Sequence, residues 1–254
     1  MQFIDTHTHI YLPEFDTDRD ATIERAVKSG VEMMLMPNID IHSVDTMMNS
    51  VERYKGRCFP MLGLHPTSVK DDYREQIEKM EQLFPLHKFI AIGEIGIDLY
   101  WDKAFIKEQI WAFKWQVSFA ASNGLPVVIH ARESFPEVFA ALEELPKIGK
   151  GVFHAFSGTP EYAKKAIDMG FKLGIGGMIT FKNAGLEKVL ENITPSYIIL
   201  ETDSPYLAPT PFRGKRNESS YLTIINKKIS DIYGIKEEEI AEMTYHNSID
   251  LFRL

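Results

Sequence analysis

The chain has 254 residues, of which 44% are hydrophobic and 25% charged, a composition typical of globular proteins. Its formal charge of −8 argues against broad, non-specific attraction to polyanions. The single cysteine, Cys58, excludes a disulfide framework and lies in an apolar run typical of a buried strand. Neither a secretory leader nor an apolar stretch of membrane length is recognisable. We therefore expect a cytoplasmic protein with no membrane segment.

Short runs rich in Ile, Val, Leu and Phe alternate with longer amphipathic stretches along the chain. Eight of these runs are predicted strands, at residues 3–7, 32–36, 58–64, 89–94, 126–130, 151–154, 172–175 and 197–201. The clearest helix is predicted over residues 105–121, where one apolar stripe consists of Ile106, Ile110, Phe113, Val117 and Ala120.

The alternation of strands and helices has no linker of low complexity and predicts one domain over residues 1–254. The expected fold is α/β, a single (β/α)8 barrel of the TIM type. A doubly wound open sheet is the alternative, but it favours a glycine-rich phosphate-binding turn after the first strand, where Thr8-His9-Ile10-Tyr11 stands. Gly174, Gly176 and Gly177 come late and without that spacing. A barrel gathers the carboxyl ends of all its strands at one face.

Residues of metal-ligand type recur where the predicted strands end. His7 and His9 are two residues apart, so both leave the same face of the first strand. A lone histidine at a strand end is more often a hydrogen-bonded structural residue. Four histidines with two carboxylates at successive strand ends instead indicate a metal site there, with the candidate ligands His7, His9, Glu94, His130, His154 and Asp203.

Six ligands exceed the three that a single catalytic zinc ion usually takes, so two divalent metal ions are predicted. Glu94 is the natural bridge, and Asp203 is expected to bind one ion and accept the proton of the attacking water, which makes these two the catalytic candidates. Glu201 is expected either to orient a ligand or to be buried for structural reasons. Imidazole and carboxylate ligands suit Zn²⁺, Mn²⁺ and, less well, Mg²⁺.

Other residues near the strand ends are candidates for substrate contact. His65 ends the third strand and is expected to contact an oxyanion. The basic run Arg213-Gly214-Lys215-Arg216 is either a solvated loop or a local contact for a polyanion. Tyr100, Trp101 and Tyr206 are expected either to stack on bases or to pack. Three histidines away from strand ends are interpreted as surface or packing residues: His42, His87 and His246.

The ordered motifs resemble the TatD family of metal-dependent deoxyribonucleases, within the metal-dependent hydrolase barrels. The resemblance covers essentially the whole chain, and its motifs are Asp5-Thr6-His7-Thr8-His9, Gly63-Leu64-His65-Pro66, Gly93-Glu94-Ile95-Gly96-Ile97-Asp98, Ile129-His130-Ala131-Arg132, His154-Ala155-Phe156-Ser157-Gly158, Leu200-Glu201-Thr202-Asp203-Ser204-Pro205 and Arg213-Gly214-Lys215-Arg216-Asn217-Glu218. It implies a TIM-type barrel with a dinuclear site that hydrolyses DNA phosphodiesters, often from the 3′ end.

The resemblance assigns roles residue by residue. The six candidate ligands match the family's metal ligands, and the matching substrate-side residues are His65, Arg132, Arg213, Lys215 and Arg216. Asp98 and Glu201 are expected to orient ligands. The family often has histidine where Thr67 stands and proline where Ser219 stands, which we expect to alter how the substrate backbone is held. Glu94 replaces the carboxylated lysine of many amidohydrolases and argues against a dihydroorotase-like or urease-like enzyme.

The expected function is a divalent-metal-dependent deoxyribonuclease that acts exonucleolytically on single-stranded DNA, because a narrow cup does not easily admit a duplex. One alternative keeps the metal site and changes the bond, as in an ester or amide hydrolase that removes an aminoacyl group from RNA. A non-catalytic binding protein is the less favoured alternative. A monomer is compatible with the sequence, which does not determine the oligomeric state.

Overall fold

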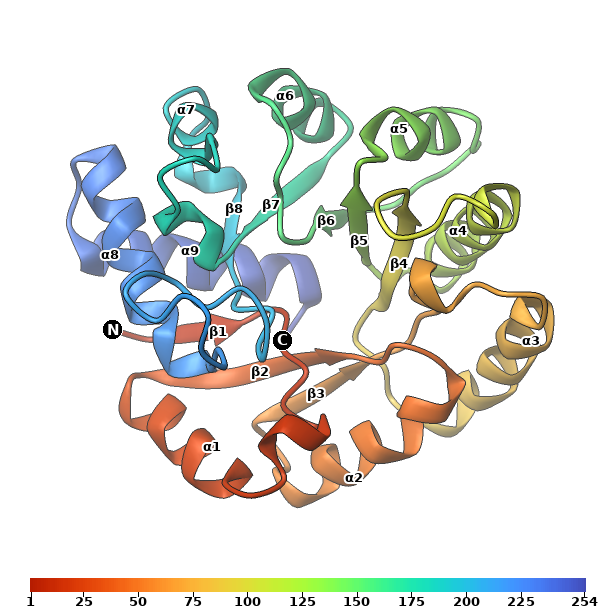
Figure 1. The fold of residues 1–254 in the computed structure, drawn as a ribbon, viewed down its shortest axis with the longest axis horizontal. Coiled ribbons are helices and arrows are strands. Elements are labelled where there is room, and N and C mark those ends of the chain that lie inside the picture. The colour runs from red at the N-terminus through yellow and green to blue at the C-terminus, as the bar shows by residue number, and fades with distance from the viewer.

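The computed structural model describes all 254 residues, Met1–Leu254, and shows parallel strands surrounded by helices (Figure 1). The strands are β1 (Phe3–Asp5), β2 (Val31–Pro37), β3 (Cys58–Met61), β4 (Ile92–Asp98), β5 (Val127–Arg132), β6 (Gly151–Phe153), β7 (Phe171–Ile175) and β8 (Ile198–Leu200). Each overlaps one of the eight predicted strands. The apolar runs of the sequence therefore located every strand of the barrel.

Helices follow the strands and pack around them. The α-helices are α1 (Arg19–Lys28), α2 (Val44–Arg53), α3 (Tyr73–Leu83), α4 (Ile106–Asn123), α5 (Phe135–Glu143), α6 (Pro160–Asp168), α7 (Leu186–Leu190), α8 (Leu222–Tyr233) and α9 (Glu237–Phe252). The 3-10 helices are η1 (Pro13–Phe15), η2 (Ile41–Ser43), η3 (Pro66–Ser68), η4 (Phe84–Leu86), η5 (Gly177–Thr180), η6 (Pro195–Tyr197) and η7 (Ser219–Tyr221). The helix predicted over residues 105–121 is α4. None of the helices combines the length and apolar character that a membrane crossing needs.

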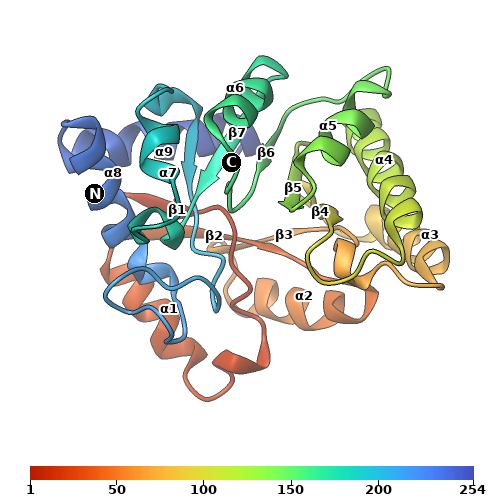
Figure 2. The same cartoon turned by 45° about the horizontal axis from the view of Figure 1, so that its top comes forward.

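The strands form two parallel ladders, β1-β2-β3 and β4-β5-β6-β7-β8. At one seam between them, Leu62 N–H donates to the carbonyl of Ala91 at 3.2 Å. At the other seam, Thr6 N–H donates to the carbonyl of Leu200 at 3.1 Å. These bonds close the sheet into a ring, which Figure 2 shows from an oblique direction. The predicted (β/α)8 barrel is confirmed, and the open sheet is excluded.

The boundaries of β4 differ from the prediction. The sequence pattern predicted a strand at residues 89–94, whereas β4 continues to Asp98 and has an irregular register between Ile92 and Ile95. Glu94 therefore lies inside the strand, and Asp98 ends it. Glycine is required at position 96 inside β4 because a Cβ there would overlap the carbonyl oxygen of His130 on β5.

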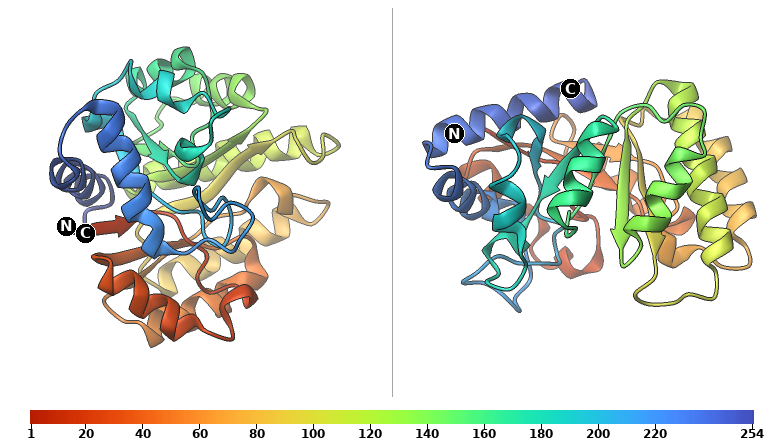
Figure 3. Two further views of the ribbon diagram at one scale, coloured as in Figure 1. Left: turned by 60° about the vertical axis from the view of Figure 1, so that its left-hand side comes forward. Right: turned by 90° about the horizontal axis from the view of Figure 1, so that it is seen from above.

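Helix α9 closes one end of the barrel. Its last residues, Leu251 and Phe252, are buried in an apolar cluster with Ile4, Leu35 and Val128 from the strands. Asn247 on the same helix donates to the carbonyl of Ile198 at the start of β8 at 2.8 Å. Figure 3 shows α9, in dark blue, across this amino-terminal end, with the loop after β8 projecting from the opposite face. Only the face at the carboxyl ends of the strands is therefore open.

Candidate metal centre

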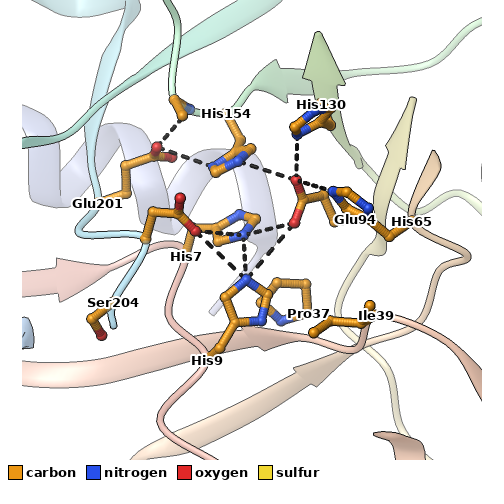
Figure 4. Close-up of polar contacts among 12 residues, drawn as sticks. His7, His9, Pro37, Ile39, His65, Glu94, His130, His154, Glu201 and Ser204 are labelled. Atoms are coloured by element: carbon orange, nitrogen blue, oxygen red, sulfur yellow. Dashed lines mark hydrogen bonds and ion pairs between the residues drawn. The ribbon is translucent and has the colours of Figure 1, made fainter. Parts of the chain in front are cut away.

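One carboxylate, Glu94, lies at the centre of the open face, between imidazoles from several strands (Figure 4). Its Oε2 is 3.1 Å from His7 Nε2 and 3.8 Å from His9 Nε2. Asp203 completes this side, because its Oδ1 is 3.7 Å and 3.6 Å from the same two nitrogens. The two histidines that follow β1 thus lie between Glu94 on β4 and Asp203, which follows β8.

The second oxygen of Glu94 faces a different set of histidines. Oε1 is 2.8 Å from His130 Nδ1 and 3.2 Å from His154 Nε2. His65 Nε2 is also near, at 3.3 Å. The two oxygens of one buried carboxylate therefore face two separate groups of nitrogen atoms.

A further carboxylate lies behind each of two histidines. Glu201 Oε1 is 3.1 Å from His154 Nδ1 and accepts a hydrogen bond from Ala155 N–H at 2.6 Å. A Cβ at position 174 would overlap Glu201 Oε2, so Gly174 makes room for this side chain. Asp98 Oδ2 is 2.8 Å from His130 Nε2. Carboxylates in these positions fix the ring orientation and proton position of a metal-binding histidine.

The hydrogen bonds also determine which ring nitrogen carries the proton. Glu201 and Asp98 can only accept when ionised, so His154 Nδ1 and His130 Nε2 carry protons. In the neutral rings, which are the forms that bind a metal, the lone pairs are then on His154 Nε2 and His130 Nδ1. The hydroxyl of Tyr11 donates to the carbonyl of Pro37 at 2.8 Å and is 3.2 Å from His9 Nδ1, from which it can accept. The lone pair of His9 is then on Nε2. Each lone pair is on the nitrogen that faces Glu94.

His65 has the opposite proton position. Thr67 N–H donates to His65 Nδ1 at 3.1 Å, and the Thr67 hydroxyl is 2.6 Å from the same atom. The lone pair is therefore on Nδ1, and in the neutral ring Nε2 carries the proton and points toward Glu94. This geometry makes His65 a hydrogen-bond donor to an anion rather than a metal ligand. It also gives Thr67 a role at a position where the family often has histidine.

Charges in the cluster change the pKa values of its members. Burial raises the pKa of Glu94, but the charges of neighbouring histidines, His154 foremost, outweigh this effect and hold the pKa well below its usual range. Burial lowers the pKa of His154, yet the carboxylates of Glu94 and Glu201 bring it well above its usual value. Burial also raises the pKa of Asp203, and the hydrogen bond with His9 overcomes this and lowers it.

The donor atoms fit divalent metal ions. Two overlapping groups of candidate ligands have their ligand atoms within 4.8 Å of one another: His7, His9 and Glu94; His7, His154 and Asp203. A third such group, of His65, Glu94 and His130, includes the imidazole that acts as a donor. His7 Nε2 and His9 Nε2 are 3.2 Å apart in a buried setting, where a shared cation accepts both lone pairs. Imidazole nitrogen and carboxylate oxygen together suit ions such as Zn²⁺ and Mn²⁺.

The structure gathers most of the predicted site residues around one cavity of about 530 Å³. Its lining includes Arg132 and His65 as well as five of the six candidate ligands, while His7 lies buried beneath it. The other histidines are separate from this cluster: His42, His87 and His246 are all exposed. Of the two interpretations of these residues, surface or packing, the structure supports the surface one.

The basic loop lies outside the lining of the cavity. Arg213 lies over the ring of Phe181 at 4.6 Å, and neither it nor Lys215 lines the cavity. Arg216 donates to both oxygens of Asp18 at 2.7 Å and to the carbonyl of Glu14 at 2.6 Å. These contacts turn Arg216 away from the cavity and attach its loop to the segment before α1. The structure therefore shows a structural role for Arg216, and its expected substrate contact stays a prediction.

Sequence reasoning did not assign a role to Asn217, which is fully buried. Its Nδ2 donates to the carbonyls of Thr202 and Tyr206, both at 2.7 Å. Between these carbonyls lies Asp203, whose backbone has a left-handed φ of +56°. Asn217 thus fixes the strained turn that presents Asp203. Its place in the motif with Arg216 is a signal, but its backbone partners are not visible in a sequence.

Comparison with known proteins identifies the family. A family model described as "TatD related DNase" matches residues 4–253. The chain belongs to this family. The TatD-related chain is 36% identical over 252 residues to a Bacillus subtilis protein named uncharacterized metal-dependent hydrolase YabD, with 98% of each chain covered. It is 31% identical over 248 residues to a Pantoea ananatis protein named 3′-5′ ssDNA/RNA exonuclease TatD, with 95% of each covered.

Solved structures agree with this assignment. The crystal structure of YjjV, a TatD homologue from Escherichia coli, superposes on the TatD-related chain with a TM-score of 0.89 and 29% identity, covering 99% and 98% of the two chains. A dihydroorotase with 16% identity and a TM-score of 0.64 shares the fold alone. The resemblance found in the motifs is confirmed, and the protein is a metal-dependent hydrolase of the TatD family.

Proposed function

We propose that this hydrolase uses two divalent metal ions to cleave phosphodiester bonds at an end of single-stranded nucleic acid. The position of Glu94 carries the proposal, because its two oxygens face two separate groups of histidine nitrogens. A carboxylate placed in this way can bridge two ions about 3.5–4 Å apart, a separation typical of nucleases and phosphatases. The name of the Pantoea relative supports nucleic acid as the substrate.

The proton positions of His9, His130 and His154 support the following choice of ligands. One ion would be held by His7, His9, Asp203 and Glu94 Oε2, and the other by Glu94 Oε1, His130 and His154. When bound, the ions supply Lewis acidity that lowers the pKa of water and offsets negative charge on phosphate. His65 is left out of both sets because its Nε2 carries a proton.

The protein's own side chains supply the remaining steps. Asp203 has a lowered pKa, so it is ionised at neutral pH and can accept the proton of the attacking water. His65 donates from Nε2 to a non-bridging phosphate oxygen, and Arg132 contributes positive charge at the rim. These contacts recognise the backbone and carry no base code. The proposed enzyme is therefore not specific for sequence.

Hydrolysis of end-labelled oligonucleotides tests the proposal. The protein is stripped of metal, reloaded with Mg²⁺ or Mn²⁺, and given single strands labelled or blocked at either end, the matching duplex and an aminoacyl-RNA. We expect stepwise shortening of single strands from one end. Asp203→Asn should be at least about 100-fold slower because its proton acceptor is lost.

The matched control is Asp231→Asn, which changes an exposed carboxylate on α8. Its rate should equal that of the wild type. Equal rates for wild type and Asp203→Asn would remove Asp203 from the mechanism. Release of the aminoacyl group with no shortening of DNA or RNA would replace the proposal with the ester-hydrolase alternative.

A further inference from the structure

Two exposed aromatic side chains stand at the rim of the metal cavity. Tyr100 and Trp101, in the loop between β4 and α4, are 49% and 69% exposed. The guanidinium carbon of Arg132, at the end of β5, is 3.7 Å from the ring centre of Tyr100 and 5.3 Å from that of Trp101. In the right-hand view of Figure 3 this yellow-green loop projects from the same face as the loop after β8, on the opposite side of the barrel.

The rim is attached to the candidate metal centre through Asp98. The N–H groups of Tyr100 and Trp101 donate to Asp98 Oδ1 at 3.0 and 3.2 Å. The other oxygen of Asp98 is 2.8 Å from His130 Nε2. One carboxylate thus fixes both a candidate ligand and the backbone that carries the aromatic rings. A surface fixed before binding loses little conformational entropy when a ligand arrives.

Trp101 lies between two cavities. It lines the metal cavity and also a neighbouring cavity of about 280 Å³, and Thr67 and Asp98 line both. The second cavity contains Lys70, whose Nζ is 3.6 Å from Asp102 Oδ2. Both partners of this ion pair are about half exposed, so water screens it and an incoming anion can compete for Lys70. Trp101 therefore has Arg132 over its ring and shares the second cavity with Lys70.

We propose that Trp101 and Lys70 form a subsite for the nucleotide next to the scissile phosphate of a single strand. Its base stacks on the indole ring, and its phosphate pairs with Lys70. This inference rests on the proposed function. An unpaired strand offers both the flat base and the phosphate that this surface suits, whereas bases within a duplex are stacked on each other. The strand then leaves the metal cavity past the loop between β4 and α4, away from the loop of Arg213 and Arg216.

Abasic substitution provides the test. Oligothymidylates are prepared with one tetrahydrofuran residue, which lacks a base, at each of the last four positions in turn. The wild type should lose about tenfold in kcat/KM when the missing base lies next to the scissile phosphate. Trp101→Ala should lose a similar factor on the complete strand and show no further loss on that abasic strand. Lys70→Ala should lower kcat/KM by the same factor on the complete and the abasic strand. Its kcat/KM should also depend less steeply on salt concentration, because one phosphate contact is lost.

Two variants of a remote cavity serve as matched controls. Tyr197 and Lys164 line a cavity that shares no residue with the other two, so Tyr197→Ala and Lys164→Ala should behave as wild type. The subsite is wrong if Trp101→Ala has the wild-type kcat/KM on the complete strand. It is also wrong if Trp101→Ala still loses about tenfold in kcat/KM when the base next to the scissile phosphate is missing. Neither result would contradict the nuclease activity itself.

Equilibrium binding separates this inference from the proposed function. Fluorescence anisotropy of labelled oligothymidylate is measured with the wild type and the same variants. Binding that depends on Trp101, without hydrolysis under any metal, would contradict the proposed function and leave the subsite intact. Equal affinities of wild type and Trp101→Ala for the oligothymidylate would contradict the proposed subsite.

Discussion

Single hydrogen bonds decide the roles of the site histidines. His154, His130 and His9 each have an acceptor at the ring nitrogen away from Glu94, while His65 has a donor there. The sequence predicted these histidines as candidate ligands at strand ends, but it could not show their proton positions. Thr67 was noted only as a departure from the family, and its contact with His65 depends on the turn at η3.

Glu201 should control one metal position through His154. Glu201→Gln keeps an acceptor oxygen but removes the charge that holds the Nδ1 proton, so we expect the affinity of one metal site to fall about 10–100-fold. Isothermal titration calorimetry of the metal-free protein with Mn²⁺ measures the affinity of both metal sites. Glu191→Gln, an exposed change, is the control. A variant that binds both ions as tightly as wild type would show that Glu201 has only a structural role.

Cys58 should be inert in the native protein. It is buried in β3, and burial raises the pKa of its thiol to about 12, so almost no thiolate exists at pH 8. We expect no reaction with a disulfide reagent such as DTNB under native conditions and one reactive thiol per chain after denaturation. Rapid native labelling would mean that β3 opens or that the thiol is accessible.

At the scale of elements, the loop after β8 brings Asp203 to the site. It is held by Asn217 from within and by the Arg216–Asp18 pair from outside. The sequence predicted the strand before this loop and the ligand on it. It could not predict the attachment, because Asp18 and Arg216 are far apart in the chain. From sequence alone, a basic run in a loop indicates contact with solvent or with a polyanion, because an acidic partner such as Asp18 is known only from the structure.

Removal of the Asn217 amide should disturb the turn of Asp203. Asn217→Asp keeps the shape of the side chain but loses the donors to two buried carbonyls, each worth about 1–3 kcal/mol. We expect lower stability in urea and a kcat reduced at least about tenfold. Asn192→Asp, in an exposed position after α7, should change neither. Full activity in Asn217→Asp would mean that the turn is held by other contacts.

The Asp18–Arg216 pair should stabilise the protein at neutral pH. Hydrogen bonds from Arg216 lower the pKa of Asp18 from 3.8 to about 2. A folded-state pKa below the unfolded value adds stability above about pH 4 that is lost as the pH falls toward 2. Asp18→Asn should therefore be less stable than wild type at pH 7, and the two urea midpoints should converge as the pH approaches 2. A difference that is independent of pH would exclude this charge effect.

At the scale of the molecule, the barrel places every candidate ligand at one open face. The order of apolar runs sufficed to predict this architecture, because a parallel barrel needs only strands and helices in alternation. Two features of the fold were not predicted, and the reasons are physical. The extension of β4 to Asp98 depends on the close approach of Gly96 to His130 on β5, and closure of the other end by α9 also depends on contacts between distant segments.

The number of metal ions bound tests the central claim most directly. Metal-free wild type and Glu94→Gln are equilibrated with saturating Mn²⁺, and bound manganese per chain is measured by mass spectrometry after dialysis. We expect two ions per wild-type chain and the loss of at least one in Glu94→Gln, because the shared ligand is weakened. Saturation of the wild type at one ion, or retention of both by Glu94→Gln with unchanged affinity, would contradict this expectation.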